Sequence, residues 1–171
     1  GVTSKLFGQQ VAESIKRQKK KLFVAEGEWD ILSIYQAGID SLAGTKYEGM
    51  EPFVVGLSCG TGNARAAASQ NLEFIESFSP VVLGFDNDAS TPEEAAKKIK
   101  KGKEALEDVG TLITKSEIYV ADFAGFHDPN DMLKAGKSKE LADAFSFATK
   151  RFSADKVVTA ESLPFESLIL P

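Results

Sequence analysis

Short apolar runs alternate with longer amphipathic segments along most of the chain. The runs cover residues 22–25, 53–57, 81–85 and 117–121. Between them, apolar residues recur with the 3.6-residue period of a helix. This alternation is typical of βαβ units, in which parallel strands are buried between two layers of helices. The pattern predicts an α/β protein whose central four-stranded, mainly parallel sheet is flanked by helices.

The amphipathic segments predict helices over residues 29–38, 64–78, 91–110 and 129–136, and a further one from Ser138 onward. The first helix is expected to end at Gly38 and to direct four side chains inward: Ile31, Leu32, Ile34 and Tyr35. We expect Trp29, at its start, to pack against the sheet edge. The sharpest start signal is the sequence Thr91-Pro92-Glu93-Glu94, which combines a capping hydroxyl with a proline in the first turn.

Composition limits the class of protein and the kind of metal site. A chain of 171 residues that is 43% hydrophobic and 26% charged fits one or at most two compact domains. One cysteine, Cys59, excludes an internal disulfide framework, and the single histidine, His127, does not complete a histidine-rich site. Any metal is therefore expected on oxygen ligands.

Neither a long apolar run nor a signal-peptide pattern is found in the sequence, so we expect no membrane association and a cytoplasmic protein. The net charge of -5 repels phosphate on average. Two basic runs, at 16–21 and 97–103, are interpreted as solvated helical faces. Charge alone therefore does not identify a nucleic-acid surface.

Acidic residues follow three of the four predicted strands: Glu26, Glu28 and Asp30, then Asp86 and Asp88, then Asp128 and Asp131. The carboxyl ends of parallel strands meet at one edge of a sheet, where ligands bind. If the first and third strands are neighbours, Glu26, Asp86 and Asp88 lie close together, and like charges at that distance favour a bound cation. Mg²⁺ prefers such carboxylates together with water and phosphate oxygens. The sequence predicts a site for Mg²⁺ or Mn²⁺.

Two of these acids have a second interpretation. Asp128 precedes Pro129 and is a good helix N-cap, and Asp131 falls in the first turn, where the helix dipole favours a negative charge. Capping alone therefore explains both residues, and either one is a candidate for the additional acid near the metal.

A glycine-rich turn precedes the second predicted helix. Gly60 and Gly62 offer backbone N–H groups to a phosphate, and Arg65 in the first helical turn would suit an anion. The alternative is an ordinary strand-to-helix turn.

The stretches FVAEGEWDILS at 23–33 and LGFDND at 83–88 form a two-part motif. The Glu-Gly-x-x-Asp pattern and the Asp-x-Asp pair, about 60 residues apart, resemble those of a TOPRIM domain, which has a Rossmann-like fold. Within that superfamily the chain is most similar, over residues 5–147, to the TOPRIM domain of bacteriophage and mitochondrial primase-helicases. Supporting segments lie at 6–8, 56–64 and 128–133.

The resemblance implies Mg²⁺-dependent nucleotidyl transfer in RNA primer synthesis during DNA replication. It implies that Glu26 is the acid/base glutamate, that Asp86 and Asp88 are metal ligands, and that Asp128 is an additional acid. Gly27 and Asp30 complete the first motif, and Asp131 is the alternative to Asp128. The implied partners are a single-stranded DNA template, ribonucleotides and a helicase domain.

Two other functions stay open at this point. A TOPRIM nuclease uses the same acids to cut phosphodiesters, and a non-catalytic module would regulate or tether a replicative helicase. The zinc ribbon and basic half of the family's primases do not fit this sequence, so we expect a module of a larger protein that is poorly active in isolation. We expect a TOPRIM domain over 1–149 and a linker-like tail over 150–171 toward a helicase. The implied setting is a bacterial or phage-infected cytoplasm, with the mitochondrial matrix as the alternative.

Overall fold

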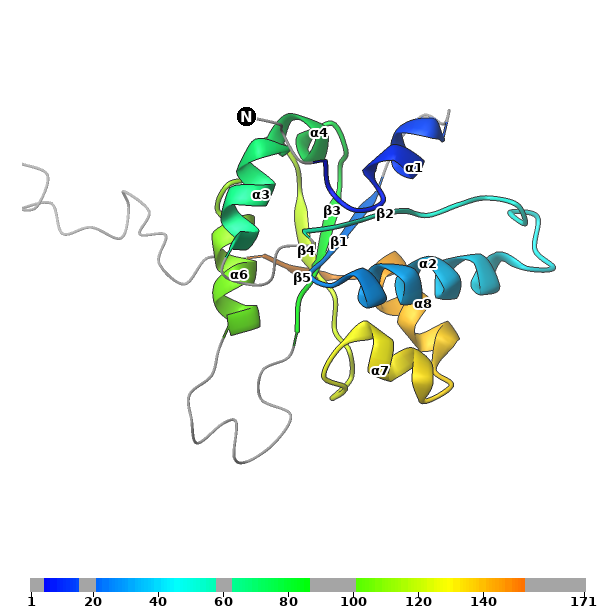
Figure 1. Ribbon diagram of the computed structural model, residues 1–171. Coiled ribbons are helices and arrows are strands. Elements are labelled where there is room, and N and C mark those ends of the chain that lie inside the picture. Colours follow the sequence, from blue (N-terminus) through cyan, green and yellow to red (C-terminus); the bar gives the residue numbers. More distant parts are fainter. Residues whose placement is uncertain (1–4, 16–20, 58–62, 87–100, 153–171) are drawn as a thin grey trace, which may run out of the picture.

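A five-stranded sheet lies at the centre of the computed structural model, which describes residues 5–15, 21–57, 63–86 and 101–152 (Figure 1). The strand order is β2-β1-β3-β4-β5. The strands are β1 (Leu22–Ala25), β2 (Phe53–Gly56), β3 (Val81–Gly84), β4 (Ile118–Val120) and β5 (Lys150–Arg151). The first four are parallel, and β5 pairs antiparallel with β4. The predicted α/β fold with a mainly parallel sheet is confirmed, and the short edge strand β5 adds to the four strands expected.

Helices cover both faces of this sheet: α1 (Gln9–Ser14), α2 (Glu28–Leu42), α3 (Ala64–Gln70), α4 (Leu72–Glu76), α6 (Lys101–Gly110), α7 (Pro129–Lys134) and α8 (Ser138–Ser146). One core cluster joins the sheet to α1, α3, α4 and α6, and the other joins it to α2, α7 and α8. The residues of β1 alternate between these two clusters, and all four are buried. Burial on both faces explains why the strands are continuously apolar in sequence.

The first crossover helix, α2, differs from its prediction in length and in orientation. It continues through Gly38 to Leu42. A Cβ at Gly38 would lie 2.8 Å from Cγ of Pro52, so this glycine permits close packing and does not end the helix. Trp29 and Leu32, expected to be buried, are 71% and 48% exposed.

The segment predicted as one helix over 64–78 is two helices, α3 and α4, separated at Asn71. The backbone of Asn71 is non-helical, with φ -115° and ψ 18°, and its side chain donates to the carbonyl of Ala67 at 3.0 Å. A polar side chain that competes for a backbone group in this way interrupts a helix. Ile75 is fully buried, as the amphipathic pattern indicates.

The later helices follow the sequence more closely. α7 and α8 match their predictions, and α6 ends at Gly110 as expected, whereas the predicted capping signal at Thr91 lies outside the described residues. The amino-terminal helix α1 was not expected. The sheet includes Arg151, and residues 153–171 lie outside the described residues, so the division at residue 149 stays a prediction.

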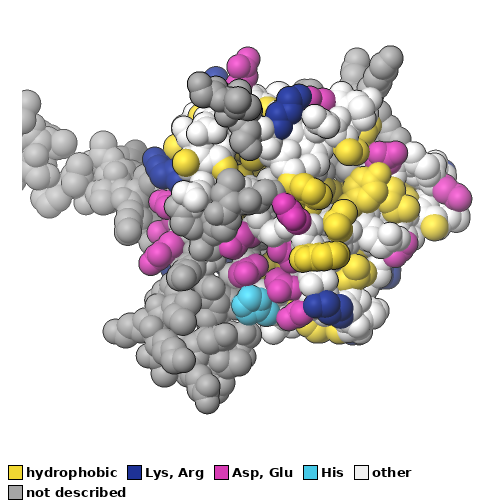
Figure 2. Space-filling view, viewed as in Figure 1, with side chains coloured by type: hydrophobic (Ala, Val, Ile, Leu, Met, Phe, Trp, Pro, Cys, Tyr) yellow, Lys and Arg dark blue, Asp and Glu magenta, His cyan; other side chains and the backbone are white. Residues whose placement is uncertain are grey.

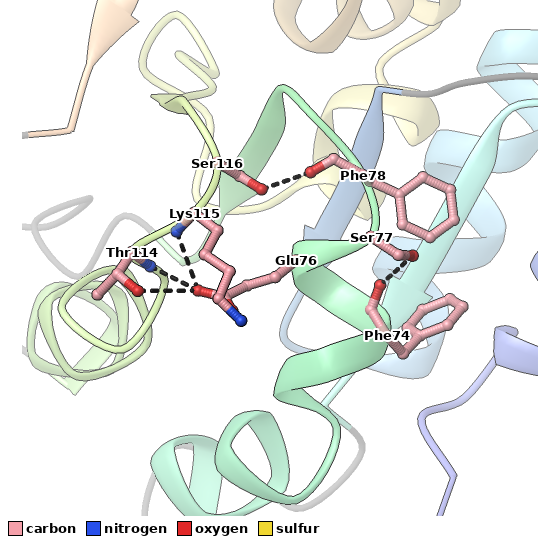
Figure 3. Close-up of polar contacts among 7 residues, drawn as sticks. All are labelled: Phe74, Glu76, Ser77, Phe78, Thr114, Lys115 and Ser116. Atoms are coloured by element: carbon pink, nitrogen blue, oxygen red, sulfur yellow. Dashed lines mark hydrogen bonds and ion pairs between the residues drawn. The ribbon is translucent and has the colours of Figure 1, made fainter.

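Glu76, at the end of α4, fastens the segment that leads into β4 (Figure 3). Its Oε1 accepts hydrogen bonds from the backbone N–H groups of Thr114, at 2.7 Å, and Lys115, at 3.0 Å. These backbone donors lower the pKa of the Glu76 carboxyl, and the N–H of Thr114 has the largest effect. The hydroxyl of Ser116 donates to the carbonyl of Phe78, which holds β3 and β4 together at their amino-terminal ends.

None of the helices in the described ranges is long and apolar enough to cross a membrane.

Candidate acidic site at the carboxyl edge of the sheet

The predicted neighbourhood of the first and third strands is confirmed. β1 and β3 pair directly, with Ala25 opposite Gly84. Glu26 is the first residue beyond β1, and Asp86 is the second beyond β3, so both emerge at the same edge of the sheet. One carboxylate oxygen of Glu26, Oε2, is buried. Asp88, the second member of the predicted pair, lies outside the described residues.

Among the described acids at this edge, Asp30 is the most buried, with 8% of its surface exposed. It is the third residue of α2, and its Oδ2 accepts a hydrogen bond from the backbone N–H of Gly27 at 3.1 Å. A helix-start acid that reaches back to the capping residue forms half of a capping box. The backbone N–H of Asn130, in the first turn of α7, also donates to this carboxyl. Asp30 therefore connects the turn after β1 to the start of α7.

Electrostatics place two more acids near Asp30. The pKa of Asp30 is raised to about 6, first by burial and then by the neighbouring carboxylates of Asp128 and Asp86, while its two backbone donors act in the opposite direction. Negative charge thus accumulates in a partly desolvated region, an arrangement that favours a cation. Asp30, a supporting residue of the predicted site, is therefore near the acids that follow β3 and β4.

Two glycines leave the space that this arrangement needs. A Cβ at Gly27 would lie 2.7 Å from Oδ2 of Asp30. A Cβ at Gly102, in the first turn of α6, would overlap the backbone carbonyl oxygen of Asp86. The glycine of the Glu-Gly-x-x-Asp motif is therefore explained by the carboxylate three residues later.

Asp128 caps α7, and its role as an additional acid near a metal stays a prediction. As the N-cap of α7, it accepts a hydrogen bond from the backbone N–H of Asp131 at 2.6 Å, so the capping interpretation is confirmed. Its charge also acts on Asp30. Asp131 is half exposed and lies 3.5 Å from the ammonium group of Lys134.

His127, Asp128 and Asp131 form a group of potential metal ligands. In the part of the chain that the structure describes, one atom of each lies within 4.8 Å of the other two. Nδ1 of His127 lies 3.2 Å from Oδ2 of Asp128, so a nitrogen donor adjoins the oxygens, which was not expected from the sequence. Of the predicted metal ligands, this group includes only Asp128. Figure 2 shows Asp and Glu side chains gathered beside the histidine.

Solved structures share this fold. The chain is similar to the crystal structure of the primase fragment of the bacteriophage T7 primase-helicase, with a TM-score of 0.55 and 25% identity. The chain has a TOPRIM-type fold. A second similar structure, with a TM-score of 0.58 and 24% identity, is the bacteriophage T7 lagging-strand DNA polymerase interacting with primase domains bound to an RNA/DNA hybrid and dTTP.

The TOPRIM-type fold accounts for most of this chain but for only part of those structures. The matches cover 76% and 77% of this chain and 45% and 56% of the two solved chains. This chain therefore spans about half of the length of the solved chains. Neither a family model nor a curated protein matches the sequence.

Of the three predicted phosphate contacts, Arg65 is the one that the structure describes, and it lies in the first turn of α3. Gly60 and Gly62 are outside the described residues. The Arg65 guanidinium donates to the carbonyl of Asp108 at 3.0 Å and to the hydroxyl of Thr111 at 3.3 Å. Arg65 thus binds the carboxyl end of α6, and its contact with a phosphate stays a prediction.

A separate open hollow of about 440 Å³ lies at the amino-terminal edge of the sheet, opposite the acids. Lys21 and Arg151 line it, and Arg151 pairs with Glu117 at 2.7 Å. This hollow is separate from the acidic site, because Lys21, Pro80 and Glu117 line it and directly precede β1, β3 and β4, at the opposite ends of these strands.

Proposed function

We propose that the chain is the TOPRIM module of a phage-type DNA primase or primase-helicase, and that it contributes Mg²⁺-dependent nucleotidyl transfer to RNA primer synthesis. The observation that carries the proposal is the gathering of Asp30, Asp86 and Asp128 at the sheet edge where Glu26 also emerges. Similarity to a primase fragment supports this function over others that the same acids permit.

The donor set fits a hard divalent cation, because it consists mainly of carboxylate oxygens. We assign the metal to Glu26, Asp86, Asp88 and Asp128, and Mn²⁺ is the expected substitute. When bound, such an ion neutralises triphosphate charge and orients the reacting groups. Glu26 either binds the ion or accepts a proton from the attacking hydroxyl group, and Asp30 fixes the turn that presents Glu26.

Substrates and partners belong to the same proposal. The solved primase domains bound to an RNA/DNA hybrid and dTTP support a single-stranded DNA template and ribonucleotides as ligands of the natural protein. The net charge of -5 means that this chain holds few phosphates without metal ions. Template binding is therefore assigned mainly to other parts of the natural protein. The proposal also includes an associated helicase domain and a cytoplasmic setting.

The test is an assay of the full natural protein with labelled ribonucleotides, single-stranded DNA and Mg²⁺ or Mn²⁺. We expect template-dependent RNA synthesis that is lost in the Glu26→Gln variant. Asp143→Asn, on the exposed side of α8, is the matched control and retains synthesis. Metal-dependent cleavage of the DNA without synthesis would contradict the proposal and favour the nuclease. The absence of both activities would favour a non-catalytic module.

A further inference from the structure

Trp29 is a large exposed aromatic side chain at the acidic edge of the sheet. It is the chain's single tryptophan, and 71% of its surface is exposed. Leu32, one helical turn further along α2, is 48% exposed. The two residues share one face of the helix, because positions three apart lie side by side. Exposed apolar side chains grouped next to a polar site are typical of ligand contacts.

The neighbours of Trp29 in α2 take the inward positions of the helix, and Asp30, Ile31 and Ser33 are buried. Asp30 faces α7, and Ile31 fills the space above Gly56, where a Cβ would overlap its Cδ1. Ser33 is 4% exposed and donates its hydroxyl hydrogen to the backbone carbonyl of Trp29 at 2.7 Å. The backbone of Trp29 is therefore held in place while its indole faces outward.

The position of Trp29 relates it to the acids. It lies in the first turn of α2, directly before Asp30 and two residues after Gly27, where the chain leaves the carboxyl end of β1. Figure 2 shows hydrophobic side chains next to the Asp and Glu side chains on this face. Trp29 therefore starts from the same edge of the sheet as the acids, with its side chain exposed.

We infer that Trp29 stacks on the base of a nucleotide whose phosphates bind at the metal-loaded acidic site, with Leu32 extending the apolar surface. This inference rests on the proposed function. Every nucleobase has a π-face, so stacking of this kind adds affinity without selecting one base. The same chemistry would serve either an incoming ribonucleotide or the primer end.

Intrinsic fluorescence provides a direct test, since all tryptophan emission comes from Trp29. The probes are ATP, CTP and inorganic tripolyphosphate, each with Mg²⁺. We expect saturable quenching by both nucleotides and little change with tripolyphosphate, which has no base. Quenching that is equal for all three probes would contradict stacking.

Calorimetry of variants completes the test. Trp29→Ala should weaken binding of Mg·ATP about tenfold and leave that of Mg·tripolyphosphate unchanged. Trp29→Phe, which keeps a ring, should stay within about threefold of the wild type. Phe147→Ala removes another exposed aromatic side chain, 73% exposed and beyond the end of α8, and serves as the control without effect.

Two results would overturn the inference, and they differ in what they say of the proposed function. If Trp29→Ala binds Mg·ATP as tightly as the wild type, stacking is wrong and the metal-phosphate site stands. If neither Mg·ATP nor Mg·tripolyphosphate binds the wild-type chain, the proposed function and the stacking inference both fail.

Discussion

Oδ2 of Asp30 accepts a hydrogen bond from the backbone N–H of Gly27 at 3.1 Å. This contact closes the turn between β1 and α2, which carries Glu26. The turn therefore depends on a buried carboxyl that is also near Asp86 and Asp128. The hydrogen bond from Gly27 stabilises the charged carboxyl of Asp30, whereas burial and the neighbouring carboxylates destabilise it.

Asp30→Asn should make the protein more stable at pH 7.5. The pKa of Asp30 is raised from 3.8 to about 6, so the folded state binds the proton more tightly, and the free energy of unfolding falls as pH rises from about 4 to about 6. The shift corresponds to at most on the order of 3 kcal/mol, and the variant should recover about 1–2 kcal/mol of it. Urea denaturation at pH 7.5 and pH 4.5 measures the difference in unfolding free energy between the variant and the wild type, which should be much smaller at the lower pH.

Asp143→Asn is the control for this experiment, because Asp143 forms an exposed ion pair with Lys139. Its effect on stability should stay within about 0.5 kcal/mol. A wild type that is more stable than Asp30→Asn at pH 7.5 would show that the charged carboxyl is a net stabiliser without metal.

Gly102→Ala should destabilise the protein and disturb Asp86. Alanine inside a helix normally stabilises by up to about 1 kcal/mol relative to glycine. At this position the added Cβ would overlap the carbonyl oxygen of Asp86, so we expect a net loss of about 1–3 kcal/mol and weaker Mn²⁺ binding. The measurements are urea denaturation and calorimetric titration with Mn²⁺. Glu104→Ala, at an exposed position of the same helix, should leave both unchanged.

Glu76→Ala should lower the melting temperature by on the order of 5 °C, because the backbone N–H groups of Thr114 and Lys115 lose their acceptor. The pKa of Glu76 is lowered from 4.5, so its stabilisation is present above about pH 4.5 and is lost as pH falls through the folded pKa. Thermal melts should therefore show a smaller difference in melting temperature between the wild type and Glu76→Ala at pH 3 than at pH 7. The exposed neighbour Glu73 is the control position, and a Glu73→Ala change of equal size would contradict the assignment.

The sequence predicted the sheet well and the helix faces less well. Continuous apolar runs identify buried parallel strands, and the neighbourhood of β1 and β3 follows from the need to bring Glu26 and Asp86 together. The buried face of α2 was harder to predict, because Asp30 is buried at a position that hydropathy assigns to solvent. Trp29 and Leu32, which were expected to be buried, are exposed.

The sequence placed Glu26, Asp30 and Asp86 at one edge of the sheet but did not indicate the contacts among the acids, and their role in a metal site stays a prediction. The motif identified Glu26, Asp30 and Asp86, but no pattern indicated that Asp30 accepts hydrogen bonds from both the β1–α2 turn and α7. The contact between the His127 ring and the Asp128 carboxylate was not predicted, because a single histidine carries no spacing signal. The interruption at Asn71 depends on one side-chain hydrogen bond, which periodicity does not reveal.

Calorimetric titration of the chain with Mg²⁺ and Mn²⁺ shows whether the acids that follow β1, β3 and β4 hold one metal centre. The variants are Asp86→Asn and Asp86→Asn/Asp128→Asn, with Asp143→Asn as the control. We expect saturable binding by the wild type and the control, at least tenfold weaker binding by Asp86→Asn, and none by the double variant. Binding by the double variant with wild-type affinity would contradict a metal centre held by these acids.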